Sequence, residues 1–338
     1  MNLKQKCNEC FIRIYNHFIF TKKLVLNKGL VIKSTGRWYI VKSLENGHLV
    51  NCTVKGKLRL KGLRSTNPVA TGDIVYFRYV SEDSKHEGVI DDVEPRKNYI
   101  IRRSSNLSKQ YHLIAANIDL AILMISLKNP KTPMEFVDRF LVSAEAYNIP
   151  SVILINKTDI YGDEEKNVQL TIENIYNKIG YQCFGLSLIT GEHFEKVKQL
   201  VTNKISVIAG NSGVGKSSLL NKIHPDLNLK TEKISGLHKT GKHTTTFAEM
   251  HELPTGGFVI DTPGIRAFGL IDIEKEELYH FFPELFEASS ECKYNNCLHV
   301  NEPGCNVKRQ IDLGLISEQR YKSYLNMLLG DQSKYRSS

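Results

Sequence analysis

No segment of the chain is apolar enough to cross a bilayer, because its 338 residues contain no run of about 18 hydrophobic positions. The apolar stretch from Phe11 to Phe20 is interrupted by Arg13 and lacks the cleavage site of a secretory signal. Without such a signal, the seven cysteines are not expected to form disulfides, and a cytoplasmic location is predicted. We expect residues 1–26 to form a disordered extension without an assigned role.

Acidic residues are scarce in the first third of the chain. Residues 1–105 contain 20 lysines and arginines against 9 acidic residues, a net charge of +11, and the remainder contains 25 against 27, a net charge of −2. The basic third is predicted to meet a polyanion, either nucleic acid or an anionic membrane. A solvated surface that only keeps the protein soluble is the alternative.

Short strands separated by turns fill residues 27–104, which predicts a small all-β domain. Its length suits a five-stranded barrel of the oligonucleotide/oligosaccharide-binding (OB) type, a fold that often grips nucleic acid. Basic residues are expected to line it, and they include Lys55, Lys57, Arg59, Lys61, Arg96 and Lys97. The first four alternate along the chain, so they would share one strand face and contact phosphates, unless that face is only solvated.

Strands and helices alternate from residue 105 to residue 270, which predicts a doubly wound α/β domain. Its buried parallel strands are expected at residues 119–125, 151–155, 205–209 and 257–260. Residues 271–338 are predicted to form a third, helical domain. The chain is therefore expected to be a multi-domain protein with an N-terminal barrel, a central α/β domain and a helical C-terminal domain.

A phosphate-binding loop is predicted at residues 210–217, where the sequence GNSGVGKS satisfies the pattern GxxxxGK[ST] between a strand and a helix. Glycines allow backbone N–H groups to approach phosphates, and the helix N-terminus adds positive potential. Lys216 is expected to reach the β- and γ-phosphates, and Ser217 to hold Mg²⁺. The predicted nucleotide contacts are Gly210, Asn211, Ser212, Gly213, Val214, Gly215, Lys216, Ser217 and Ser218.

A base-reading motif, specific for guanine, is predicted where the sequence NKTD follows the strand at residues 151–155; its residues are Asn156, Lys157, Thr158 and Asp159. The carboxylate of such a motif accepts hydrogen bonds from guanine N1 and the 2-amino group, which adenine cannot offer. A buried site built to pair with those donors rejects the wrong base strongly. Ser187 begins a segment, SLITG, that resembles the loop supporting the base.

A nucleotide switch is predicted in the sequence DTPG, where Asp261 would contact Mg²⁺ through water and the Gly264 N–H would sense the γ-phosphate. In the preceding polar segment, Thr245 is favoured over the neighbouring threonines as a further Mg²⁺ ligand. The base-reading motif precedes the phosphate loop, which reverses the order of most GTPases. The sequence therefore predicts a circularly permuted GTPase domain.

A structural zinc site is predicted in the last domain, with the spacing Cys-x4-Cys-x-His-x5-Cys. Its ligands would be Cys292, Cys297, His299 and Cys305. Three thiolates and one imidazole fill a tetrahedral shell and leave no position for water, which is typical of structural zinc.

Taken together, these motifs resemble the ribosome-small-subunit-dependent GTPase A (RsgA) family over about residues 27–330. The most specific matches are GNSGVGKSSLLN, GKHTTT, DTPGIRAFG and CKYNNCLHVNEPGCNV. The resemblance implies a factor that binds the small ribosomal subunit and its rRNA during late maturation. It also implies slow hydrolysis of GTP to GDP and phosphate, stimulated by that subunit. We expect a monomer that does not bind membranes.

The catalytic group cannot be the glutamine that follows the switch motif in many GTPases, because Ile265 occupies that position. The resemblance implies that His243 orients the attacking water instead; a solvated loop histidine is the alternative. Two other functions stay open. One is a nucleotide-gated RNA-binding module whose hydrolysis is incidental, and the other is a membrane-associated GTPase that uses its basic face on anionic lipid.

Overall fold

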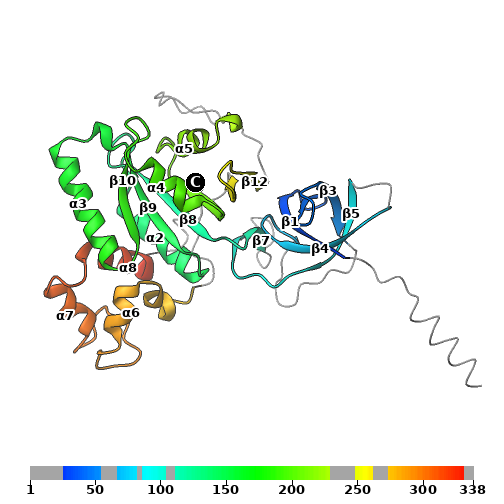
Figure 1. Ribbon diagram of the computed structural model, residues 1–338. Helices are drawn as coiled ribbons and strands as arrows, with labels where there is room; N and C mark the ends of the chain where they lie inside the picture. Colours follow the sequence, from blue (N-terminus) through cyan, green and yellow to red (C-terminus); the bar gives the residue numbers. More distant parts are fainter. Residues whose placement is uncertain are drawn as a thin grey trace, which may run out of the picture.

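A computed structural model describes residues 26–54, 67–81, 86–103, 111–228, 248–261 and 273–330 of the chain. Figure 1 shows a β-barrel beside a central α/β domain, with the last helices beneath that domain. The predicted extension at residues 1–26 lies outside the described residues except for its last position. No helix in the described ranges has both the length and the apolar composition required to span a bilayer.

The N-terminal domain is a closed five-stranded barrel, as the sequence predicted. Its strands are β1 (Asn27–Ser34), β2 (Tyr39–Ser43), β3 (Leu49–Val54), β4 (Ile74–Tyr79) and β5 (Glu87–Val93). They are ordered β1-β2-β3-β5-β4, and β4 pairs back with β1 to close the barrel. Alternate residues point inward, so that Val41 and Val50 pack against Phe77 and Ile90. The basic segment Lys55–Lys61 lies outside the described residues.

One of the basic residues expected on the barrel surface is buried instead. The Arg96 guanidinium forms a two-pronged ion pair with Asp73, with Nε 2.6 Å and Nη2 2.7 Å from the carboxylate oxygens. The Asp73 side chain is fully buried and the Arg96 side chain is 7% exposed. Lys97 is paired as well, with Asp119. The Arg96 guanidinium is therefore engaged inside the barrel by Asp73 and is not part of a phosphate-contacting surface.

The central domain is built on a six-stranded sheet with the order β10-β9-β8-β11-β13-β12, in which only β12 is antiparallel. The strands are β8 (Leu120–Ile125), β9 (Ser151–Asn156), β10 (Gln182–Leu186), β11 (Ile205–Ala209), β12 (Glu249–Glu252) and β13 (Phe258–Asp261). The helical segments are α2 (Met134–Ala146), η1 (Thr158–Ile160), α3 (Asp163–Lys178), α4 (Phe194–Val201), α5 (Lys216–Ile223) and η2 (Pro225–Leu227).

Both faces of this sheet are covered, which explains the continuous apolar runs of its strands. Leu123 and Ile125 pack with α2 and α3 on one face, and Ile122 and Met124 pack with α4 and α5 on the other. This arrangement is the predicted doubly wound fold. In such sheets, ligands bind at the carboxyl ends of the parallel strands.

Two connections join the barrel to the central domain. A two-stranded sheet of β6 (Tyr99–Arg103) and β7 (Tyr111–Ala116) leads from one to the other, and the predicted boundary at residue 104 lies between them, outside the described residues. In addition, β12 pairs with β1, so that barrel and central sheet are hydrogen-bonded into one sheet. The Lys33 ammonium lies 2.8 Å from the Glu249 carboxylate at that junction.

The C-terminal domain is helical and packs against α2 (Figure 1). Its elements are η4 (Lys275–Phe281), α6 (Pro283–Ser289), α7 (Asn306–Asp312) and α8 (Glu318–Leu329). Apolar side chains of α6 and α8 share one core with Val142 of α2. Arg320 of α8 also reaches Asp138 of α2 across this interface, with Nη1 and Oδ1 2.8 Å apart.

Candidate nucleotide and zinc sites

The predicted phosphate loop connects β11 to α5 at the carboxyl edge of the sheet. Gly210 has φ +143°, and a Cβ there would lie 2.3 Å from the Met124 carbonyl oxygen of the neighbouring strand. Gly215 has φ +106°, and a Cβ there would lie 2.4 Å from the Asn156 amide nitrogen. Only glycine fits either position, because other residues would be strained and would collide with the neighbouring groups.

Lys216 folds back over this loop. Its ammonium donates hydrogen bonds to the carbonyl oxygens of Gly210 and Asn211, at 2.7 and 2.8 Å. The positive charge therefore lies inside the loop, at the N-terminus of α5, where backbone N–H groups and the helix dipole favour an anion. The neighbouring candidates Ser212, Gly213, Ser217 and Ser218 lie on the same loop and first helical turn.

The base-reading motif touches the phosphate loop directly. Asn156 is the last residue of β9, and its amide nitrogen donates a 2.7 Å hydrogen bond to the Val214 carbonyl oxygen. Its amide oxygen is buried and has no partner among the described residues. Burying a polar atom without a partner costs free energy, so a ligand donor at this position would complete the site. Lys157 follows in the left-handed region, with φ +71°, and its ammonium donates to the Asn129 carbonyl oxygen.

Asp159 is held by the loop that follows β10. The Ser187 hydroxyl donates a 2.6 Å hydrogen bond to Asp159 Oδ1. The same hydroxyl oxygen accepts from the Thr190 N–H at 3.1 Å, so the serine is fixed by its own loop. The Thr158 hydroxyl donates a hydrogen bond to the Glu192 carboxylate of that loop. The structure thus brings Asn156–Asp159, Ser187 and the phosphate loop together at one edge of the sheet.

Other predicted residues cannot be located in this way. His243, Thr245 and Gly264 lie outside the described residues, and Asp261 is described only as the last backbone position of β13. That strand lies beside β11, and its carboxyl end is at the same edge as the phosphate loop.

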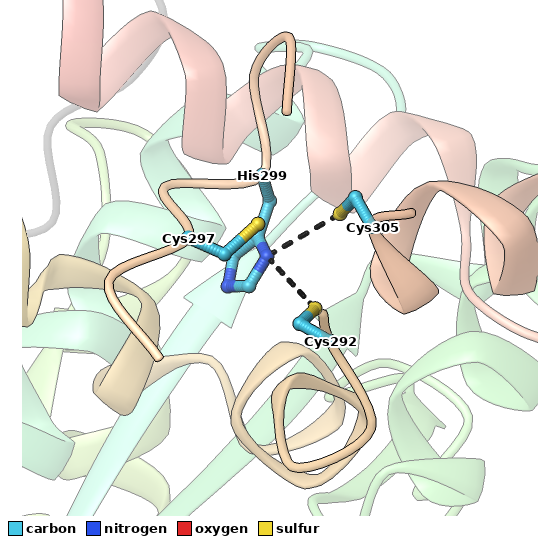
Figure 2. A group of neighbouring side chains, drawn as sticks. All are labelled: Cys292, Cys297, His299 and Cys305. Atoms are coloured by element: carbon cyan, nitrogen blue, oxygen red, sulfur yellow. Dashed lines mark hydrogen bonds between the residues drawn. The ribbon is translucent and has the colours of Figure 1, made fainter. Parts of the chain in front are cut away.

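The four predicted zinc ligands converge in the C-terminal domain (Figure 2). Their ligand atoms all lie within 4.8 Å of one another. The Nδ1 atom of His299 is 3.7 Å from Cys292 Sγ and 3.5 Å from Cys305 Sγ. Tetrahedral zinc, with bonds of about 2.3 Å to sulfur and 2.0–2.1 Å to nitrogen, places such atoms about 3.6 Å apart. The set fits zinc, and its four ligands leave no open position.

Contacts around the cluster hold its ligands in place. The Asn306 N–H lies 3.3 Å from Cys292 Sγ, and the Tyr321 hydroxyl donates to the His299 carbonyl oxygen at 2.5 Å. The Glu302 carboxylate accepts from the N–H groups of Leu298, Val300 and Asn301 at 2.8–3.0 Å. Burial lowers the pKa of His299, which favours the neutral imidazole that a metal requires.

The edge of the sheet therefore carries a phosphate loop and an NKxD motif in reversed chain order, which defines a circularly permuted GTPase. A barrel precedes this GTPase domain, and a helical domain with a Cys₃His cluster that fits zinc follows it. The chain belongs to the RsgA family. Residues 93–271 match the family model described as RsgA GTPase, and residues 28–90 match the RsgA N-terminal domain.

Individual relatives agree over nearly the whole chain. The small ribosomal subunit biogenesis GTPase RsgA of Bacteroides fragilis (strain YCH46) is 50% identical, covering 92% of this chain and 99% of the relative. The protein of that name from Flavobacterium psychrophilum is 48% identical, covering 91% and 94%. Among solved structures, YjeQ from Thermotoga maritima has a TM-score of 0.75 at 35% identity and covers 91% of this chain and 100% of its own. YloQ, a circularly permuted GTPase, has a TM-score of 0.72 at 29% identity, covering 94% and 98%.

Proposed function

We propose that this protein is a GTPase that acts in the biogenesis of the small ribosomal subunit and hydrolyses GTP to GDP and phosphate. The observation that carries the GTPase assignment is the 2.7 Å hydrogen bond between Asn156 and the Val214 carbonyl, which joins the base-reading motif to the phosphate loop. Its RsgA relatives carry the ribosomal assignment in their names. The Cys₃His cluster would hold zinc as a structural component, because its four ligands leave no open position on the metal.

Each motif has one task in this reaction. Asp159 would accept the guanine donors while Ser187 holds its other oxygen. When GTP binds, the Lys216 ammonium would give up its hydrogen bonds to the Gly210 and Asn211 carbonyl oxygens and donate to phosphate oxygens instead. Mg²⁺, held by Ser217 and Thr245 with Asp261 acting through water, would neutralise charge on the phosphates.

We infer that His243 orients the attacking water. The supporting observations come from the sequence. Ile265 cannot act as the water-orienting residue, and His243 lies in the polar segment between the phosphate loop and DTPG, which corresponds to the first switch of other GTPases. Contact with rRNA would bring His243 to the attacking water and so raise the hydrolysis rate. His243→Ala should keep guanine nucleotide affinity and lose the stimulation by small subunits; normal stimulated turnover would contradict this role.

We also propose that the barrel contacts rRNA and that the protein works as a monomer. The sole tryptophan, Trp38, precedes β2 and is 56% exposed beside the exposed Arg37. An exposed aromatic ring next to a positive charge can stack on an unpaired base, which is worth about 1–3 kcal/mol per base. The high net charge of the N-terminal third favours the same partner over a neutral protein surface.

Co-sedimentation with small subunits, in the presence of a non-hydrolysable GTP analogue, tests the rRNA contact. Trp38→Ala should weaken binding about tenfold, as expected for one lost base stack. Leu44→Ala is the matched control, because Leu44 is 52% exposed on the same barrel but has no aromatic ring to stack. Equal binding by both variants and the wild type would contradict a role for Trp38, and binding to liposomes instead of subunits would favour the membrane alternative.

A further inference from the structure

The Tyr161 hydroxyl joins the ends of two strands beside the nucleotide site. It donates a 2.5 Å hydrogen bond to the Asn156 carbonyl oxygen at the end of β9. It also accepts a 2.9 Å hydrogen bond from the Leu127 N–H, just beyond the end of β8, and lies 3.3 Å from Ser126 Oγ. The Tyr161 side chain is buried, with 6% exposure, so water does not substitute for these partners.

The held carbonyl belongs to the first residue of the base-reading motif. Asn156 is thereby fixed at two points, its carbonyl by Tyr161 and its amide by the Val214 carbonyl of the phosphate loop. The next residue, Lys157, has φ +71°. A residue other than glycine in this region costs free energy and persists only where its surroundings hold it. The hydrogen bond from the Tyr161 hydroxyl holds the Asn156 carbonyl, directly before the left-handed residue Lys157.

From these contacts we infer that Tyr161 is a positioning residue for guanine recognition, holding the backbone at Asn156 so that Asp159 meets guanine N1 and the 2-amino group. The inference rests on the proposed function, since it concerns the selectivity of the same site. Tyr161 touches neither base nor phosphate, and it acts through Asn156 and the left-handed turn at Lys157.

The hydroxyl, and not the ring, carries this role. Burial raises the pKa of Tyr161, so the hydroxyl keeps its proton at neutral pH and can donate to the Asn156 carbonyl. Tyr161→Phe keeps the packed ring but leaves the Asn156 carbonyl and the Leu127 N–H without this partner. Buried polar groups without partners favour a rearranged backbone, which would move Asp159 relative to the base.

The test compares the binding of GDP and IDP by calorimetry, because inosine lacks the 2-amino group. The phosphate contacts are common to both nucleotides, so the ratio of their dissociation constants reports the base alone. The wild type should prefer GDP about tenfold or more, the worth of one hydrogen bond to a charged acceptor. In Tyr161→Phe, the preference should fall about threefold or more, because the carboxylate is displaced.

Tyr181→Phe is the matched control. Tyr181 is also 6% exposed in the same domain, and its hydroxyl donates to Glu145 at 2.9 Å. It directly precedes β10, at the opposite edge of the sheet from the base-reading motif. This change should lower stability without changing the GDP-to-IDP ratio. Ser126→Ala is a second variant. It retains Tyr161 but removes the hydroxyl that lies 3.3 Å from the Tyr161 hydroxyl, so it should lower the GDP-to-IDP preference, by less than Tyr161→Phe does.

The outcomes separate the inference from the proposed function. If Tyr161→Phe folds and keeps the full GDP preference, the inference is overturned and the GTPase assignment stays intact. If Tyr161→Phe does not fold, the same result in Ser126→Ala overturns the inference. A wild type that does not prefer GDP over IDP would contradict the inference together with guanine reading by Asp159, and GTP turnover tests the GTPase assignment separately. A ratio reduced equally in Tyr181→Phe would also overturn the inference, because the effect would then be one of general stability.

Discussion

Arg320 should be among the most sensitive positions for attachment of the C-terminal domain. Its side chain is 1% exposed and binds Glu284 through Nε at 2.7 Å and Asp138 through Nη1 at 2.8 Å. The guanidinium also lies over the Phe282 ring, 4.7 Å from its centroid. It thereby joins α8 to α6 and to α2 of the central domain.

Replacing Arg320 with methionine keeps the volume of the side chain but removes its charge. Two carboxylates would remain buried, since Asp138 is 0% and Glu284 8% exposed. Breaking a buried ion pair in this way costs about 3–5 kcal/mol. Burial already raises the pKa of Asp138, so without Arg320 this carboxyl would take up a proton, which favours the lower end of that range. Adding Asp138→Asn to Arg320→Met should recover part of the loss.

Native-state hydrogen exchange of the α8 amides measures this cost, because a protein of several domains does not unfold in one step. Lys322→Met is the control on the same helix. Lys322 pairs with Glu318 at 2.7 Å, but their side chains are 66% and 70% exposed, so its loss should cost less than about 0.5 kcal/mol. An opening free energy for α8 that changes as little in Arg320→Met as in Lys322→Met would refute the reasoning.

Two further predictions concern the nucleotide and zinc sites. Asp159→Asn should weaken GDP binding about a hundredfold and improve XDP binding, because the amide donates where xanthine has a carbonyl. Calorimetry with both nucleotides checks this, and a variant that still prefers GDP over XDP would contradict it. Burial opposes ionisation of Glu302, but its backbone N–H partners lower its pKa overall; this stabilisation is therefore present above the carboxyl's unfolded pKa and is lost as pH falls through the folded value. Zinc should accordingly be released in acid, at a higher pH in Glu302→Gln than in the wild type, as a chromogenic chelator would report; equal release profiles would argue against the role of Glu302.

Several elements could be predicted because their signals are local. The phosphate loop needs glycines at Gly210 and Gly215, since the backbone there excludes a side chain, and the zinc ligands lie within one short segment. The apolar run of β8 follows from a sheet covered on both faces. Such patterns depend on chain spacing alone, and the sequence contains them in full.

Other features depend on contacts between distant residues. Arg96 was expected on the barrel surface, but its partner Asp73 is 23 positions earlier, and no periodicity marks that pair. The junction of β1 with β12 joins Lys33 to Glu249, 216 positions apart. Tyr161 was not predicted as a functional residue, because a tyrosine two positions after NKTD looks like an ordinary core residue until its hydroxyl partners are known.

GTP turnover by the purified protein, alone and with small or large ribosomal subunits, tests the central claim most directly. We expect slow turnover alone, stimulation of several tens-fold by small subunits, and no stimulation by large subunits. Asp159→Asn should strongly reduce the stimulated GTP turnover at the same subunit concentration when GTP is limiting. A slow rate that neither subunit changes would leave the GTPase fold in place and contradict the role in small-subunit biogenesis.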